Sequence, residues 1–110
     1  MKELLENINE FLASGEDNLK KKRFNAAITD FFKSIIISCD YLIYTEIKLI
    51  PKNHNQRFSL LSKYFQEIYT RVSELFVVYT KSYNLRLDFD EAIKFKEYSN
   101  ELKNIIRSKK

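Results

Sequence analysis

The stretch Pro51-Lys52-Asn53-His54 contains the only proline and the only histidine of the 110-residue chain. Imidazole is well suited to acid–base catalysis near neutral pH, which makes His54 the first candidate for a reactive group. The same stretch is typical of a joint between two helices, because proline ends a helix and asparagine often starts one as its N-cap. Gln56 completes a capping box, in which Asn53 and Gln56 each accept a hydrogen bond from the other's backbone N–H. We therefore expect Pro51, Asn53 and His54 to form a helix joint, with His54 in the first helical position rather than in a catalytic site.

Other catalytic and metal-binding patterns are missing from the sequence. With one histidine and one cysteine, Cys39, a zinc site of the usual His/Cys kind cannot be assembled within one chain, so we expect no metal and no cofactor. Three acidic residues of one apolar segment, Asp30, Asp40 and Glu46, follow no ligand spacing. We expect them on the solvated face of a helix, with a metal or acid–base role as the alternative. The single glycine excludes a glycine-rich phosphate loop, and the enzyme class is therefore disfavoured.

Basic residues offer a second kind of chemistry, the binding of phosphate groups. The chain has 19 basic and 15 acidic residues, which gives a net charge of +4. A cationic patch attracts nucleic acid through the release of counterions. Because the two signs are interspersed along the chain, a solvated surface is the simpler interpretation, and contact with RNA or a nucleotide is the alternative. The candidate phosphate-binding residues are Lys20, Lys21, Lys22, Arg23, Lys81 and Arg86.

The spacing of apolar residues predicts helices throughout the chain. Apolar residues make up 45% of the sequence and recur every three or four positions, while one glycine and one proline leave little material for β-turns. The predicted helices cover residues 2–22, 24–50, 54–65, 67–82 and 88–107. We predict one all-α domain over residues 1–110, an up-and-down bundle of four to five helices joined by short connections. No apolar stretch approaches the ~18 residues of a membrane span, so we expect a cytoplasmic protein without a membrane segment.

The predicted helix over residues 24–50 carries two apolar stripes. One holds Phe24, Ile28, Phe31, Ile35 and Leu42, and the other holds Phe32, Ile36, Cys39, Ile43, Ile47 and Ile50. A helix that is apolar on two sides is either the centre of a bundle or a member that also contacts a second chain. Because a small bundle has few helices to cover both stripes, we expect a homodimer with an isologous two-fold interface. Tyrosine combines an apolar ring with a hydroxyl that tolerates water, and the candidate rim residues are Tyr41, Tyr44 and Tyr83.

Three segments occur in an order that is similar to that of a known family. They are FNAAITDFFKSIIISCDYLIY, IPKNHNQRFSLL and YTKSYNLRLDFDEAIKFKEYSNELKNII. Over residues 16–107 the chain resembles the HEPN (higher eukaryotes and prokaryotes nucleotide-binding) domain family, particularly its small stand-alone members. The most specific piece is the joint at Pro51 and His54, where Asn53 takes the place of a threonine. The resemblance implies a bundle of four or five helices that commonly dimerises, often works beside a minimal nucleotidyltransferase, and cleaves RNA in its toxin members.

The chain departs from the family at the ribonuclease motif, which is an arginine, four to six residues and a histidine. The corresponding stretch YTKSYNLRLDF has no histidine, and no arginine precedes His54 at that spacing. Lys81 and Arg86 can bind phosphate, but neither replaces an imidazole at neutral pH. The resemblance therefore implies a non-catalytic, homodimeric interaction module with a minimal nucleotidyltransferase as candidate partner. A nucleic-acid or nucleotide-binding module and a divergent ribonuclease are the alternatives.

Overall fold

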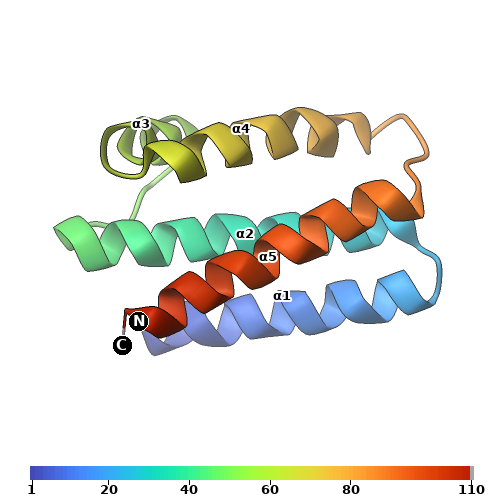
Figure 1. Ribbon diagram of the computed structural model, residues 1–110, viewed down its shortest axis with the longest axis horizontal. Coiled ribbons are helices and arrows are strands. Elements are labelled where there is room, and N and C mark those ends of the chain that lie inside the picture. Colours follow the sequence, from blue (N-terminus) through green and yellow to red (C-terminus); the bar gives the residue numbers. More distant parts are fainter. Residues whose placement is uncertain (110) are drawn as a thin grey trace.

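The computed structural model describes residues 1–109 and contains five helices in that range. They are α1 (Lys2–Lys20), α2 (Phe24–Ile47), α3 (His54–Tyr64), α4 (Gln66–Lys81) and α5 (Phe89–Ser108). Helices α1 and α4 run in one direction and α2 and α5 in the other, and the short α3 lies at the end where α2 stops (Figure 1). The predicted all-α bundle is confirmed. Within residues 1–109, no helix is both long and apolar enough to cross a membrane.

Helix α2 is the central helix, with α1 and α5 packed on one part of its surface and α3 and α4 on another (Figure 1). Both predicted stripes lie largely in the core, where the fully buried members are Ile28, Phe31, Ile35, Cys39, Leu42 and Ile43. The last member of the second stripe, Ile50, is 44% exposed, so its predicted burial is wrong. Of the two interpretations of a two-sided apolar helix, the structure shows the centre of a bundle. Contact with a second chain stays a prediction.

Gly15 sets the distance between α1 and α2. A Cβ atom at this position would lie 2.5 Å from a ring carbon of Phe31, which is fully buried on α2. A glycine inside a helix costs about 1 kcal/mol relative to alanine. Here its missing side chain makes room for the phenyl ring, and α1 continues through Gly15 without interruption.

The end of α2 differs from the prediction. The helix was expected to continue to residue 50 and to stop because of Pro51, but it ends at Ile47. Lys48 adopts the left-handed conformation with φ of 58°, and its N–H donates to the Tyr44 carbonyl at 2.8 Å. Left-handed caps usually carry glycine, so a lysine gives no such signal in the sequence.

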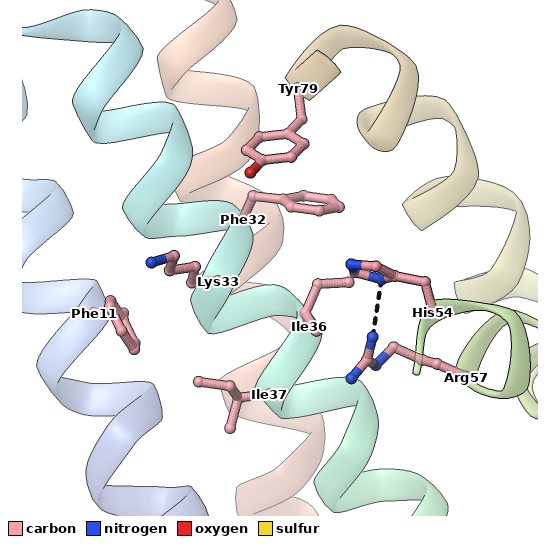
Figure 2. Close-up of a pocket in the computed structure, with 8 residues that line it drawn as sticks. All are labelled: Phe11, Phe32, Lys33, Ile36, Ile37, His54, Arg57 and Tyr79. Atoms are coloured by element: carbon pink, nitrogen blue, oxygen red, sulfur yellow. Dashed lines mark hydrogen bonds between the residues drawn. The ribbon is translucent and has the colours of Figure 1, made fainter. Parts of the chain in front are cut away.

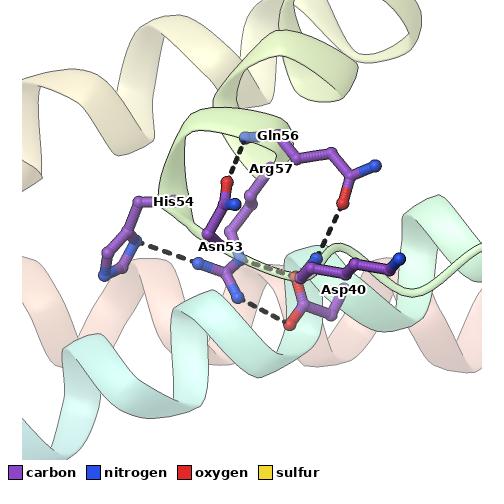
Figure 3. A network of polar contacts seen from close by, with 6 residues as sticks. Asp40, Asn53, His54, Gln56 and Arg57 are labelled. Atoms are coloured by element: carbon purple, nitrogen blue, oxygen red, sulfur yellow. Dashed lines mark hydrogen bonds and ion pairs between the residues drawn. The ribbon is translucent and has the colours of Figure 1, made fainter.

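The start of α3 follows the predicted joint. Asn53 is the N-cap, its Oδ1 accepts from the Gln56 N–H at 2.8 Å, and His54 is the first helical residue. The second bond of the expected capping box is wrong by one residue, because Gln56 Oε1 accepts from the N–H of Lys52, at 2.7 Å, rather than from that of Asn53 (Figure 3). Pro51, which precedes this turn, is buried.

Candidate functional site

A groove opens on α2 between two of its neighbours. Figure 2 shows α1 on one side, α3 and α4 on the other, and α5 behind α2. The groove has a volume of about 300 Å³. Its residues come from four helices: Phe11, Phe32, Lys33, Ile36, Ile37, His54, Arg57 and Tyr79. We call this surface the α2 groove. Its walls are mainly aromatic and aliphatic, which is typical of a binding site rather than of a solvated helix face.

A buried ion pair lies beside the groove and connects α2 to α3. Arg57 donates through Nε to Asp40 Oδ1 at 2.6 Å and through Nη2 to Asp40 Oδ2 at 2.9 Å (Figure 3). The two side chains are only 11% and 10% exposed. The prediction that Asp40 lies on a solvated face is therefore wrong. Its counter-charge comes from another helix, 17 residues later in the chain, and no local pattern indicates such a pair.

His54 extends this network toward the groove. Arg57 Nη1 lies 2.9 Å from His54 Nδ1. A guanidinium group only donates hydrogen bonds, so Nδ1 accepts and the neutral ring carries its proton on Nε2. The ring also lies near Phe58 and Phe76, at centroid distances of 6.3 and 6.0 Å. The predicted helix-start position of His54 is confirmed, and the bond to Arg57 is an additional role that the sequence did not indicate.

Two further polar side chains border the groove. The Lys33 ammonium group lies 5.3 Å from the centre of the Phe11 ring. Tyr79 stacks on Phe32 with ring centroids 4.5 Å apart, and its hydroxyl lies 3.0 Å from that of Tyr83. The hydrogen bond to Tyr83, together with partial burial, raises the pKa of Tyr79 to about 12. Tyr79 is therefore a neutral hydroxyl at physiological pH, and Lys33 is the exposed cation of this surface.

The predicted phosphate-binding residues come together at the opposite end of the bundle from α3. Figure 1 shows the turn between α1 and α2 and the loop between α4 and α5 at this end. Asn25 joins the two segments: its Nδ2 donates to the carbonyls of Ser82 (3.0 Å) and Leu85 (2.7 Å), and its Oδ1 accepts from the Leu87 N–H at 2.9 Å. No sequence pattern indicates this role of Asn25. We call the surface that these segments form, with Lys20, Lys21, Lys22, Arg23, Lys81 and Arg86, the basic end.

Acidic residues offset part of the charge of the basic end. Lys21 Nζ lies 2.8 Å from Asp17 Oδ2, and this contact lowers the pKa of Asp17. Lys81 and Arg86 share a shallow groove with the acidic residues Asp88 and Glu91. The basic end is thus a mixed surface with a surplus of positive charge.

The three candidate rim tyrosines do not form one patch on a protomer. Tyr41 and Tyr44 lie on the C-terminal half of α2 and are partly buried. Tyr83 follows α4 beside the basic end and is 75% exposed. An interface centred on α2 near Tyr44 would include the first two residues and not the third.

Comparison with protein-family models, with curated proteins and with solved structures found no match to this chain. Within residues 1–109, no three His, Cys, Asp or Glu side chains gather closely enough to hold a metal ion. The site is therefore described by its own geometry: an apolar groove on the central helix, bordered by a lysine and by an imidazole whose orientation an ion pair fixes.

Proposed function

We propose that the protein is a non-catalytic helical interaction module of the HEPN type, which forms a homodimer and binds a protein partner in the α2 groove. The observation that carries the proposal is the groove itself. Helix α2 supplies more of the core than any other helix, yet Ile36 and Ile37 stay partly exposed between α1 and α4. Apolar side chains on an open face of a core helix favour contact with another protein. The resemblance to HEPN domains makes a minimal nucleotidyltransferase a candidate partner.

The proposed homodimer uses the C-terminal half of the same face of α2. At about 100° per residue, Lys33, Ile37 and Tyr44 lie within about 40° of one another around the helix axis. The face therefore continues from the groove to Tyr44, about 10 Å beyond Ile37. Two large apolar residues directly after α2, Leu49 and Ile50, are also exposed, by 39% and 44%. A two-fold interface here would cover them and leave the groove open to a partner.

Substitution of Tyr44, on α2, tests the dimer. Chromatography with light scattering should give a dimer for the wild type and a monomer for Tyr44→Asp, because a carboxylate in an apolar interface is strongly unfavourable. Tyr83→Asp is the matched control, since Tyr83 lies outside the proposed interface, and it should stay dimeric. A Tyr44→Asp protein that elutes with the wild-type mass would exclude this interface.

The non-catalytic part of the proposal is tested with RNA. Structured and single-stranded RNA should stay intact after incubation with the purified protein. Cleavage that persists through repeated purification and disappears in His54→Ala would favour the divergent ribonuclease instead.

Binding of nucleic acid at the basic end is a second candidate function. What supports it is the bridge at Asn25, which brings six basic residues from two segments to one surface. Such binding would weaken steeply with salt, since it depends on released counterions. Measurement of RNA affinity across salt concentrations, with Arg23→Glu and Arg86→Glu beside the wild type, tests it. Equal affinities in the three proteins would exclude the basic end as the contact.

A further inference from the structure

The α2 groove lies where an additional helix could pack on α2 between α1 and α4. Helices α1 and α4 lie on either side of α2 and run in the same direction (Figure 1). On the opposite face α5 packs against α2, where Ser99 Oγ donates to Ser34 Oγ at 2.9 Å and Phe95 meets Phe32 with ring centroids 6.1 Å apart. On the groove face, the aliphatic side chain of Ile37 is partly exposed. This apolar surface of α2 suits an amphipathic helix that packs its apolar side into the groove.

The hydrogen bonds beside the groove orient the His54 imidazole so that its Nε2–H can donate. Asp40 holds Arg57 by two hydrogen bonds, and Arg57 in turn donates to His54 Nδ1. Because Nδ1 is an acceptor in this chain of contacts, Nε2 carries the proton of the neutral ring. Figure 2 shows the imidazole reaching from α3 toward Ile36. His54 Nε2–H is therefore an oriented hydrogen-bond donor at the groove.

The charge of the groove is positive. Lys33 is exposed, and its ammonium group lies over the Phe11 ring at 5.3 Å. The charge of Arg57 is balanced by Asp40. None of the eight residues drawn around the groove is acidic (Figure 2). An occupant with a lysine or arginine here would meet an uncompensated cation, whereas a carboxylate would meet the Lys33 ammonium group on the α1 side of the groove or the His54 N–H on the α3 side (Figure 2).

We propose that the occupant of the α2 groove is an amphipathic helix of a partner protein, with a carboxylate placed beside its apolar residues. The inference rests on the proposed function and specifies the chemistry of the partner. Ile36 and Ile37 contact the apolar side of the incoming helix. Lys33 on the α1 side of the groove and His54 Nε2–H on the α3 side are the two groups that can bind its glutamate or aspartate, which selects against neutral and basic helices of the same shape.

Three synthetic peptides test this selection. Each is a helix of about 16 residues with the same apolar stripe, long enough to form a helix on binding, and they differ only in carrying Glu, Gln or Lys beside the stripe. Fluorescence anisotropy should show about tenfold tighter binding of the Glu peptide than of the Gln peptide, as expected for hydrogen bonds to a charged group. The Lys peptide should bind most weakly.

Reversing the charge of Lys33 tests whether this residue selects the peptide. Lys33→Glu should reverse the order of the three peptides, so that the Lys peptide binds best. Lys63→Glu is a matched control, because Lys63 is also an exposed lysine 5.3 Å from an aromatic ring, that of Tyr64, but lies outside the groove. It should keep the wild-type order. Circular dichroism of both variants verifies that each stays folded.

The single histidine allows a direct spectroscopic readout. Long-range ¹H–¹⁵N correlation spectra should show one imidazole, with Nδ1 unprotonated and Nε2 protonated in the free protein. The Glu peptide should shift the Nε2 resonance, and the Gln peptide should shift it less. A free ring protonated at Nδ1 and not at Nε2 would overturn the donor assignment.

The outcomes separate the two proposals. Equal affinity for all three peptides would overturn the acidic partner and leave the groove as a protein-binding site. No binding of any peptide would overturn both the acidic partner and the groove as a site for a helix, while a dimer that persists would still support the proposed homodimer. If Ile37→Asp made the protein monomeric, the occupant of the groove would be a second copy, and the inference would be wrong.

Discussion

The α2 groove and the basic end are two surfaces of one bundle that are built in different ways. Residues from four helices form the groove, and its polar members Arg57 and His54 bond to each other while Asp40, beside the groove, holds Arg57. The basic end collects exposed side chains in and beside two connecting segments, and the side chain of Asn25 joins those segments. Polar atoms are fixed in the first region. In the second, the charged groups are exposed to solvent.

This difference indicates what each surface can recognise. A fixed donor beside apolar walls discriminates among partners by shape and charge, because a mismatch leaves a polar group unpaired. Exposed lysines attract any polyanion, and salt screens the attraction. We therefore assign selective binding to the α2 groove, and the basic end would contribute attraction without selectivity.

The largest expected effect is the loss of the buried pair. Asp40→Asn should destabilise the protein by about 3 kcal/mol, because it leaves the Arg57 charge buried without its counter-charge. Urea unfolding followed by circular dichroism measures this. Asp17→Asn, which breaks the exposed pair with Lys21 at the basic end, is the control and should leave the unfolding midpoint unchanged. Similar midpoints for the two variants would remove the contrast between a buried and an exposed ion pair.

The next effect concerns the bridge that holds the basic end together. Asn25→Ala removes three hydrogen bonds to the loop before α5 and should cost about 1–2 kcal/mol, since water can replace part of them. The amide of Leu87 should lose its protection against hydrogen exchange. Asn84→Ala, an exposed residue of the same loop, should leave that amide protected. Unchanged protection in Asn25→Ala would show that the loop is held by other contacts.

His54 should matter less for stability than the pair that orients it. His54→Ala removes one hydrogen bond of an exposed side chain and should cost about 0.5–1 kcal/mol, measured by urea unfolding. Affinity for the Glu peptide should fall by a few-fold while affinity for the Gln peptide stays the same. A loss of stability as large as that of Asp40→Asn would make His54 part of the structural pair instead.

The last effect appears only at alkaline pH. The pKa of Tyr79 is raised from 10.0 to about 12 by the hydrogen bond to Tyr83 and by burial, so folding favours the protonated hydroxyl. This contribution to stability is fully present below pH 10 and is lost as the pH rises toward 12. Tyr79→Phe should therefore lose less stability than the wild type between pH 10 and 12 in thermal unfolding. Parallel curves for the two proteins would contradict the shift.

Most of the fold could be predicted because its signals are local. Apolar spacing located all five helices, and the cap at Asn53, which accepts from an N–H three residues later, marked the start of α3. The end of α2 was missed by three residues. A left-handed lysine, Lys48, ends that helix, and lysine has no preference for this conformation.

Much less of the candidate site could be predicted, because its key contacts join residues far apart in the chain. In the sequence, Asp40 cannot be distinguished from a charge on a solvated helix face, because its partner Arg57 lies on α3, 17 residues later. Asn25 contacts residues about sixty positions later, and no spacing rule relates them. The basic residues were recognised as a group by type, yet their placement on one surface depends on that unrecognised contact.

Sedimentation equilibrium of the wild-type protein at micromolar concentration, in low and in high salt, tests the central claim most directly. A homodimer held by tyrosine and aliphatic side chains of α2 should have twice the 13.2 kDa mass of the chain and should persist in high salt, because apolar burial is not screened. A mass of 13.2 kDa across the concentration range, or a dimer that dissociates when salt is added, would contradict it.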